Sequence, residues 1–503
     1  MSLAIVHSRA ALGVQAPPVQ VEVHLANGLP GTTVVGLPET AVKESRDRVR
    51  GAITNSRFEF PIRRITVNLA PADLPKEGGR FDLPIALGIL AASGQIPAAA
   101  LAHYECLGEL ALGGELRGVR GVLPAALACR DQQRQLLIAQ DNAAEGALVA
   151  DLAVYGAEHL LDVCQHLRDG HTLLPQTSAR PEGIRPVVAD LAEVRGQHHA
   201  KRALEVAAAG AHNLLFVGPP GTGKTMLASR LPGILPPLNE AEAMASAAIA
   251  SISRQGLILE QWGIRPFRSP HHTASAVALV GGGSQPRPGE ISLAHSGVLF
   301  LDELPEFSRQ VLDVLREPLE SGRITISRAA RQAEFPAQFQ LVAAMNPCPC
   351  GYLGDEERAC RCSSEQVRRY RARVSGPLLD RIDLHVEVPR LPYRALRSVN
   401  REESTAVVQQ RVIIARERQL ARAGKPNALL GPREIERDCR LTDADHNLLE
   451  RFMSQLSLSP RAYHRILRVA RTIADLAAEP QIGTAHLSES IGYRALDRGT
   501  AHR

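Results

Sequence analysis

The sequence predicts an α/β protein in which a first α/β domain precedes a nucleotide-binding α/β core and a helical C-terminal part. Three observations predict this class. A chain of 503 residues has room for about three domains, each with its own core. A short apolar run at residues 214–217 ends in a glycine- and proline-rich turn and continues with helical spacing. Residues 396–503 also carry apolar side chains at helical spacing.

The composition is that of a globular protein of the cytoplasm. Hydrophobic residues make up 45% and charged residues 22% of the chain. No run of about 18 apolar residues exists, and the first residues lack the layout of a signal peptide, so we expect no membrane partner. The net charge of +5 fits a polyanionic partner without requiring one. The eight cysteines are then expected to be thiols or metal ligands rather than disulfides.

Residues 1–168 are predicted to form one α/β domain. Apolar runs and alternating segments predict strands, and helical spacing predicts helices between them. The expected strands are Val19–His24, Arg64–Leu69 and Leu136–Ala139, and the expected helices are Leu83–Ala92 and Leu123–Arg130. The Gly113-Gly114 pair between apolar stretches predicts a hairpin.

Two stretches of this domain, residues 72–82 and 107–130, resemble the proteolytic domain of Lon-type proteases, which has the fold of ribosomal protein S5 domain 2. Where that family has its nucleophilic serine, this chain has Arg80, and where the family has the partner lysine, it has Leu123. A serine–lysine mechanism needs a hydroxyl beside an amine. We therefore expect a Lon-like domain that is not a protease and that serves docking or assembly.

Residues 169–188 contain several prolines and glycines and are expected to form a linker. Residues 189–395 are then the α/β core that binds the nucleotide. Residues 396–503 are expected to form a helical lid on that core.

The turn after the strand Leu214–Val217 has the spacing of a phosphate-binding loop. Its residues are Gly218, Pro219, Pro220, Gly221, Thr222, Gly223, Lys224 and Thr225. Glycines let backbone N–H groups turn toward phosphates, the start of the helix Lys224–Leu231 adds a partial positive charge, and Lys224 adds a full one. Thr225 offers a hydroxyl to Mg²⁺. An ordinary Gly/Pro turn is the alternative, but the strand–turn–helix context predicts a site for ATP with Mg²⁺.

Carboxylates follow a second apolar strand. Residues 297–301 lead into Asp302 and Glu303, and open α/β sheets bind ligands at the C-terminal ends of their strands. Asp302 is expected to hold Mg²⁺ through water, and Glu303 to orient and deprotonate the attacking water. A third apolar strand, Gln340–Ala344, leads to Asn346. Asn346 is expected to bond the γ-phosphate or the attacking water, although a residue before a proline also suits a turn.

Two arginines further along the chain have the chemistry of transition-state stabilisation. Arg381 carries a fixed charge that suits phosphoryl transfer, in the same or a neighbouring subunit, with a surface arginine as the alternative. Arg461 follows Ser459 and Pro460, which predict the start of a helix. From there Arg461 is expected to reach back to the nucleotide and couple the helical lid to hydrolysis.

A cluster of thiols lies between the third apolar strand and Arg381. Its members are Cys348, Cys350, Cys360 and Cys362. Four thiolates are a ligand set for tetrahedral Zn²⁺, although one intervening residue within each pair is fewer than usual. Four reduced thiols in a loop are the alternative. We expect a structural zinc, because half of the cysteines gather here.

Taken in chain order, these motifs resemble the AAA+ ATPases, in the branch of the magnesium-chelatase ATPase subunit and the replicative MCM helicases. The resemblance implies that Arg381 is an arginine finger acting on a neighbouring subunit and that Arg461 is a second sensor. In related ATPases a segment such as 191–197 lies against the adenine, which makes Gln197 a nucleotide contact; a helix that serves packing alone is the alternative. The finger implies a ring, most often a homo-hexamer.

A Lon-like domain joined to this ATPase narrows the resemblance to the ComM/YifB family of competence proteins, which also matches residues 267–272 and 288–295. The family implies a helicase that drives branch migration with ATP and integrates incoming single strands in natural transformation. Its implied partners are single-stranded and branched DNA and recombination proteins. Two alternatives remain: a chelatase-type ATPase that remodels a protein partner, and a regulatory ATPase whose product is a conformational change.

Two insertions in the ATPase core are candidate DNA contacts. Residues 324–335 resemble the hairpin that related helicases project into their pore, where Arg328 and Arg331 would follow backbone phosphates. The other is Ser269–Gly283, whose three consecutive glycines predict a mobile loop. A further candidate is the run Arg368, Arg369, Arg371 and Arg373. For each of these, a solvated charged face is the competing interpretation.

Overall fold

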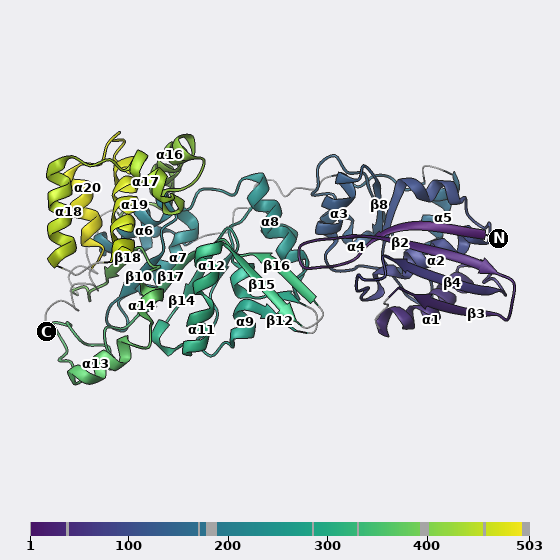
Figure 1. Cartoon of the computed structure of the whole chain (residues 1–503), viewed down its shortest axis with the longest axis horizontal. Helices are drawn as coiled ribbons and strands as arrows, with labels where there is room; N and C mark the ends of the chain where they lie inside the picture. Colours follow the sequence, from purple (N-terminus) through teal and green to yellow (C-terminus); the bar gives the residue numbers. More distant parts are fainter. Residues whose placement is uncertain are drawn as a thin grey trace.

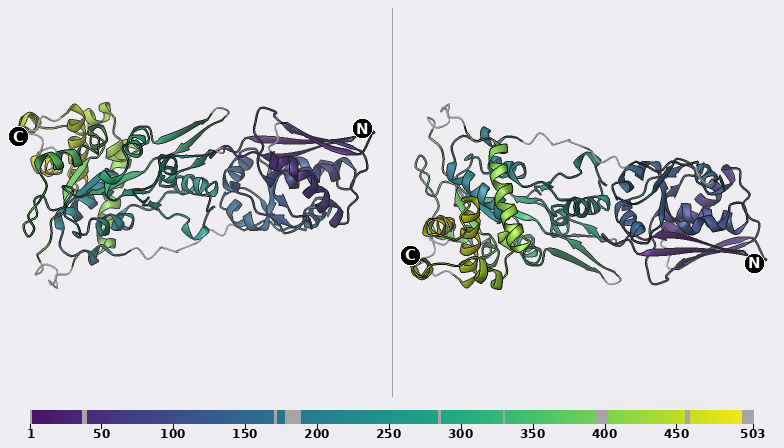
Figure 2. Two further views of the ribbon diagram at one scale, coloured as in Figure 1. Left: turned by 90° about the horizontal axis from the view of Figure 1, so that it is seen from below. Right: turned by 90° about the horizontal axis from the view of Figure 1, so that it is seen from above.

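The computed structural model describes residues 2–36, 40–169, 172–177, 189–283, 286–328, 331–392, 402–455 and 459–494. The molecule is elongated, with the N-terminal part at one end, an α/β core in the middle and helices of the C-terminal part at the other end (Figures 1 and 2). Most of the predicted linker 169–188 lies outside the described residues. Within the described ranges, no helix has the length and hydropathy needed to cross a membrane.

The N-terminal part is built on a seven-stranded sheet. Its order is β3 (Gly31–Val35), β4 (Arg64–Ala70), β2 (Pro18–Ala26), β1 (Ser2–Arg9), β5 (Tyr104–Leu107), β8 (Gln135–Ala139) and β9 (Val154–Ala157). The helices are α1 (Thr40–Asn55), α2 (Asp82–Ala92), α3 (Val122–Asp131), α4 (Gln140–Gly146) and α5 (Leu160–Asp169). The predicted strands and helices of this part are all present. The predicted hairpin at Gly113-Gly114 joins β6 (Glu109–Leu110) to β7 (Leu116–Arg117).

The α/β core contains a five-stranded parallel sheet. Its order is β11 (Phe267–Arg268), β14 (Val298–Leu301), β17 (Gln340–Met345), β10 (Leu214–Val217) and β18 (Leu384–Glu387). The helices of the core are α6 (His198–Gly210), α7 (Lys224–Ile234), α8 (Glu240–Ser251), α9 (Ala276–Val280), α10 (Glu290–Leu293), α11 (Arg309–Val314), α12 (Arg316–Ser321), α13 (Ser364–Arg371) and α14 (Gly376–Leu379). Because parallel strands run the same way, the C-terminal ends of β10, β14 and β17 meet at one edge.

The two faces of this sheet follow from the alternation of side chains along each strand. In β10, Leu214 and Phe216 pack with α6 and α7, whereas Leu215 and Val217 pack with the opposite layer. All four residues of β10 are buried, as expected for a parallel strand covered on both faces. This double burial explains why the strands are continuous apolar runs in the sequence.

The C-terminal part consists of helices. They are α16 (Thr405–Ala423), α17 (Pro432–Asp438), α18 (Asp443–Gln455), α19 (Pro460–Leu476) and α20 (Thr484–Gly492). The Ser459 hydroxyl accepts a hydrogen bond from the Ala462 N–H at 3.3 Å, so the predicted cap of α19 is confirmed. Val469 and Ile473 of α19 belong to the same hydrophobic cluster as α6 and α16, which attaches the helices to the core.

Two hairpins extend from the core toward the N-terminal part. They are β12–β13 (Gly281–Gly282 and Arg287–Pro288) and β15–β16 (Arg323–Arg328 and Arg331–Pro336). Figure 1 shows β15–β16 reaching toward the N-terminal part, and α8 lying between the two parts. The Gly121 N–H donates to the Ser251 carbonyl at 3.1 Å, and Leu123 shares a hydrophobic cluster with Ala247 of α8. The contact between the parts is therefore packed and hydrogen-bonded.

Candidate functional site

The loop between β10 and α7 forms an open cradle. Gly221 and Gly223 have φ of 77° and 90°, and a Cβ added to either would meet no protein atom within 4 Å. A Cβ on Gly218 would instead lie 2.2 Å from the Val388 carbonyl oxygen, so packing requires that glycine. The loop borders a cavity of about 370 Å³. Its left-handed glycines leave room for a ligand against the backbone, which fits the phosphates of ATP.

Lys224 lies at the floor of this cavity and is held by acceptors. Its Nζ donates to the carbonyl oxygens of Gly218 at 2.7 Å and Pro219 at 2.8 Å, and to Asn346 Oδ1 at 3.2 Å. Burial lowers the pKa of Lys224, and the negative charges of Asp302 and Glu303 oppose this effect. The bond to Asn346 brings the end of β17 to the phosphate loop, where the sequence predicts this side chain.

The two predicted carboxylates also line this cavity. The Thr225 hydroxyl donates to Asp302 Oδ2 at 2.6 Å, and the Glu303 N–H donates to Asp302 Oδ1 at 2.9 Å. A threonine hydroxyl beside a carboxylate is an oxygen donor set that suits Mg²⁺. The structure therefore brings together the residues predicted to bind the phosphates and the metal and to activate water.

Glu303 has a partner that sequence reasoning missed. His272 Nδ1 lies 3.2 Å from Glu303 Oε2, and Glu303 itself has a left-handed backbone with φ of 53°. The neighbouring His271 instead contacts the Thr273 hydroxyl through its Nδ1 at 2.9 Å. Both histidines lie within the candidate DNA-binding insertion Ser269–Gly283, and no spacing rule distinguishes the one that reaches Glu303.

Gln197 contacts the backbone around the phosphate loop. Its Nε2 donates to the Pro389 carbonyl at 2.8 Å and lies 3.5 Å from the Thr222 carbonyl oxygen. The residue precedes α6 and has a left-handed backbone with φ of 51°. Gln197 thus connects the loop to the segment after β18, while its role against adenine stays a prediction.

Arg381 and Arg461 border a second cavity, of about 490 Å³, that Lys224 does not line. The Arg381 guanidinium pairs with Glu320 and donates to the Pro377 carbonyl at 2.5 Å. The structure does not bring Arg461 to the phosphate loop of its own chain, because the first turn of α19 faces this second cavity. Both predicted arginines are therefore on a surface separate from the carboxylates of the same chain.

Two further arginines of α19 belong to this second cavity and were not predicted as functional. Arg465 and Arg468 follow Arg461 on the same helix and line the same cavity. Arg465 Nε lies 3.6 Å from Asp383 Oδ1, and burial lowers the pKa of both arginines. Their i, i+4 and i+7 spacing from Arg461 places them on one helix face, which is the signal that could have identified them.

The four cysteines of the predicted zinc site converge. Their sulfur atoms all lie within 4.8 Å of one another, with Cys348–Cys350 at 3.4 Å, Cys348–Cys360 at 3.7 Å and Cys350–Cys360 at 3.6 Å. Tetrahedral zinc with bonds of about 2.3 Å places its sulfurs about 3.8 Å apart. N–H groups of Tyr352 and Arg361 lower the pKa of Cys350 to about 6. The donor set fits a structural Zn²⁺, which has no open position for catalysis.

This cysteine loop also lies against the phosphate loop. A Cβ on Gly351 would lie 2.6 Å from Pro220 Cδ in the phosphate loop and 3.9 Å from Asn346 Cγ. Arg371 of α13 donates from Nε to the Pro347 carbonyl at 3.2 Å. The loop that carries the cysteines therefore packs against the outside of the phosphate loop at Pro220.

The candidate DNA contacts have different surroundings. Residues 323–336 form the predicted hairpin, with Arg328 opposite Arg331 at its tip; the side chains of these two arginines are outside what the structure describes. In Ser269–Gly283, α9 and β12 form in place of a loop without regular structure. In the arginine run, Arg369 pairs with Glu365 at 2.8 Å and Arg373 pairs with Glu306 at 2.9 Å.

The positions that correspond to the Lon nucleophile and its lysine hold Arg80 and Leu123, and both are buried. The Leu123 N–H donates to Glu145 Oε1 at 3.1 Å. Neither side chain offers a nucleophile or a proton acceptor for peptide hydrolysis.

Family models of magnesium chelatase match three stretches of the chain. "Magnesium chelatase, subunit ChlI" matches residues 190–396, "Magnesium chelatase, subunit ChlI C-terminal" matches residues 402–494, and "Subunit ChlI of Mg-chelatase" matches residues 21–142. The first stretch contains the phosphate loop, both carboxylates, Asn346 and Arg381. The second contains α19 with Arg461.

Full-length relatives are also similar to this chain. It is 58% identical to competence protein ComM of Haemophilus influenzae, over 99% of this chain and 98% of that protein. It is 55% identical to YifB of Salmonella typhimurium and 54% identical to YifB of Escherichia coli, in each case over 100% of this chain and 99% of the relative. It is also 27% identical to the magnesium-chelatase 38 kDa subunit of Cereibacter sphaeroides, over 30% of this chain and 51% of that subunit.

Proposed function

The chain belongs to the ComM/YifB family of magnesium-chelatase-like AAA+ ATPases, and on that premise we propose that it is a DNA motor. In this proposal a hexamer of identical chains hydrolyses ATP, moves along DNA and drives branch migration. The biological role is the integration of incoming single strands during natural transformation, with single-stranded and branched DNA as substrates and recombination proteins as partners. The name of the Haemophilus influenzae relative, a competence protein, supports this role.

One observation supports a ring of subunits in this proposal. The phosphate loop and carboxylates border one cavity, and Arg381 and Arg461 border another. A transition state of phosphoryl transfer needs cations around the transferred group, and Lys224 is the one basic residue that lines the first cavity among the described residues. A neighbouring chain that places its second cavity against the first would add Arg381 and Arg461. The site is then complete only between two subunits.

Within that shared site, each described residue has a defined task. The cradle of Gly221, Gly223 and Lys224 binds the phosphates, and Thr225 with Asp302 holds Mg²⁺. Bound Mg²⁺ would neutralise charge on the phosphate oxygens. Glu303 accepts a proton from the attacking water, and Asn346 orients that water from the end of β17.

The hairpin β15–β16 is the proposed DNA contact. Ile324, Ile326, Ala333 and Phe335 belong to one hydrophobic cluster with Leu299 and Leu301 of the central sheet. The hairpin therefore shares one hydrophobic core with β14, whose end carries Asp302 and Glu303. This packing connects the hairpin, whose tip is the proposed DNA contact, to the residues proposed to hydrolyse ATP.

The proposed function is tested with a synthetic four-way junction. The wild-type chain is expected to hydrolyse ATP faster when DNA is present and to convert the junction into two duplexes. Lys224→Ala is expected to lose nucleotide binding, and Glu303→Gln to bind ATP without hydrolysing it; neither should move the branch point. ATP hydrolysis that ignores DNA, with no branch movement, would instead favour a chelatase-type ATPase that remodels a protein partner.

A further inference from the structure

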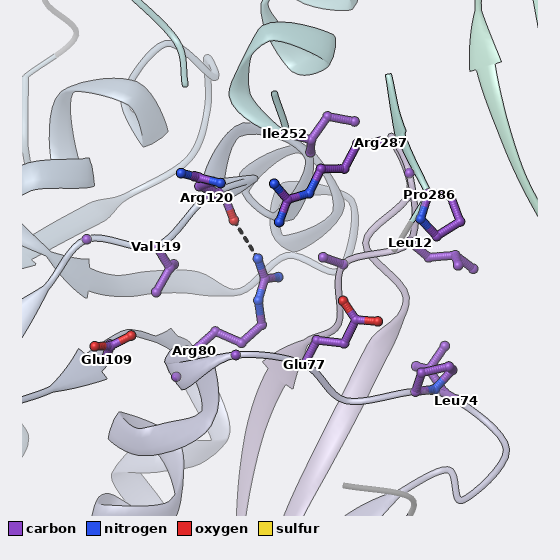
Figure 3. Close-up of a pocket in the computed structure, with 16 residues that line it drawn as sticks. Leu12, Leu74, Glu77, Arg80, Glu109, Val119, Arg120, Ile252, Pro286 and Arg287 are labelled. Atoms are coloured by element: carbon purple, nitrogen blue, oxygen red, sulfur yellow. Dashed lines mark hydrogen bonds between the residues drawn. The ribbon is translucent and has the colours of Figure 1, made fainter. Parts of the chain in front are cut away.

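A cavity of about 350 Å³ lies where the N-terminal part meets the ATPase core. Arg80 and Arg120 reach it from the N-terminal part, and Arg287 reaches it from β13 of the core. Figure 3 shows the guanidinium groups of Arg80 and Arg287 directed toward the same space, with Arg120 beside them. Neither the ATP site nor the proposed arginine finger uses this cavity.

Arg80 is the unusual member of this group. Its side chain is buried, with the residue 7% exposed, and its guanidinium donates to the carbonyl oxygens of Arg120 at 2.5 Å and Arg9 at 3.4 Å. Two other arginines nearby have carboxylates: buried Arg9 pairs with Glu105 at 2.6 Å, and partly buried Arg48 pairs with Asp82 at 2.8 Å. Among the ion pairs of the described residues, none involves Arg80. Its burial lowers the pKa of the guanidinium to about 10.

Two acidic residues, Glu77 and Glu109, and three arginines line the cavity. The Glu109 carboxylate lies against Gly79, where an added Cβ would be 2.4 Å from Oε2, and Figure 3 shows Arg80 between Glu109 and Arg287. Burying a guanidinium without an opposite charge is costly. An anion in the cavity would remove that cost.

We propose that this cavity binds a phosphate group, held by the guanidinium groups of Arg80, Arg120 and Arg287. Guanidinium forks match phosphate oxygens in geometry and keep their charge at every physiological pH. The volume of the cavity is at the lower end of that of ligand pockets, which suits a phosphate with part of a sugar. The site draws residues from both parts of the chain, so an occupied cavity ties them together.

The position of the cavity favours the DNA backbone as the source of this phosphate, and that choice depends on the proposed DNA motor. Gly13 at the cavity wall lies against β16, with its Cβ position 3.5 Å from both Ala333 Cβ and the Glu334 carbonyl oxygen. Arg287 belongs to the hairpin β12–β13, where Gly281 lies against Ile326 of β15. A DNA strand bound at the tip of β15–β16 would thus pass close to the three arginines. A free phosphate ion has the same chemistry.

The test uses the full chain with Arg120→Gln and Arg287→Gln together. Arg80 stays intact, because its substitution would also remove the bond to the Arg120 carbonyl. The matched control is Arg46→Gln with Arg440→Gln, which removes the same charge from exposed positions outside the cavity. Binding of a fluorescein-labelled single-stranded oligonucleotide is measured by anisotropy over a range of salt concentrations. Thermal unfolding is measured with inorganic phosphate and with chloride at equal ionic strength.

If DNA is the source, the cavity variant should bind the oligonucleotide about tenfold more weakly, with a salt slope shallower by about 0.7 for each lost phosphate contact. The control should keep the wild-type slope. If the source is a free ion, phosphate should raise the unfolding temperature of the wild type and the control but not of the cavity variant, with DNA affinity unchanged. If the cavity variant and the control bind the oligonucleotide equally well and respond equally to phosphate, the proposed phosphate site is refuted.

These outcomes separate the cavity from the proposed function. A wild-type chain that hydrolyses ATP but binds no oligonucleotide would refute the DNA motor. The phosphate measurement would still decide whether the three arginines form an anion site. Conversely, a working DNA motor whose affinity and phosphate response ignore Arg120 and Arg287 would refute the cavity alone.

Discussion

The imidazole of His272 holds the carboxylate of Glu303, with Nδ1 3.2 Å from Oε2. His272 belongs to the first insertion of the core, Ser269–Gly283. Leu279 in the same insertion packs in one hydrophobic cluster with Ile326 of the hairpin β15–β16. The same insertion therefore carries the histidine that contacts the proposed general base and a leucine that shares a hydrophobic cluster with the proposed DNA hairpin.

We predict that His272→Ala raises ATP hydrolysis measured without DNA by about two- to fivefold, because a partly exposed contact between an imidazole and a carboxylate contributes up to about 1 kcal/mol. DNA should then stimulate the variant less than the wild type, since the restraint on Glu303 is already gone. His103→Ala is the control, because it removes an exposed imidazole of the N-terminal part. Steady-state ATPase assays with and without single-stranded DNA check this, and a lower basal rate in His272→Ala would contradict it.

We predict that the cysteine loop supports the phosphate loop through Gly351. In Gly351→Ala the new Cβ would lie 2.6 Å from Pro220 Cδ, so the dissociation constant for ATP should rise about tenfold, equivalent to about 1.4 kcal/mol. Gly354→Ala is a matched control: its φ of 80° resembles the 85° of Gly351, and its Cβ would meet no atom within 4 Å. Both variants place an alanine at a positive φ and share that backbone strain. Equal losses of ATP affinity would therefore refute a role for the contact between Gly351 and Pro220.

We predict that the purified chain contains about one zinc ion, bound by the four cysteines. Cys360→Ser should release the metal and lower the unfolding temperature, while Cys439→Ala, which alters a buried thiol outside the cluster, should keep it. Elemental analysis of the protein after dialysis measures this. A wild-type content below about 0.2 zinc per chain would rule out the site.

We predict that Arg328→Ala with Arg331→Ala weakens binding of single-stranded DNA and makes it less salt-dependent, because each arginine that contacts a phosphate adds about 0.7 to the salt slope. Binding of a fluorescent ATP analogue should stay unchanged, since no residue of β15–β16 is among those that line the nucleotide cavity. DNA affinity equal to that of the wild type at physiological salt would refute the assignment of this hairpin to DNA.

Local chemistry explains what could be predicted from the sequence. The phosphate loop, Asp302 and Asn346 each end a buried strand of one parallel sheet, so their convergence follows from strand direction. The cysteines converge because they are close in sequence. Ser459 caps α19 because a serine before a proline satisfies free N–H groups at a helix start.

Long-range packing explains what could not be predicted. Arg461 faces the cavity of Arg381 rather than Lys224 because α19 packs on α6 and α16, and no local signal fixes that choice. The pairing of His272 with Glu303 depends on the path of an insertion across the edge of the sheet. The arginines around Arg80 meet because the N-terminal part packs on the core, with α3 against α8 and Gly13 against β16, which joins segments far apart in the sequence.

The central claim is that one chain supplies the phosphate loop of each site and a neighbouring chain supplies Arg381. Mixing the Lys224→Ala and Arg381→Ala proteins tests it most directly. Each variant alone is expected to lose ATP hydrolysis, about 10³-fold for the arginine. The equimolar mixture should recover about a quarter of the wild-type rate, because a head-to-tail ring pairs intact halves at one interface in four. A mixture as inactive as its parts, or an Arg381→Ala protein as active as the wild type, would contradict the shared site.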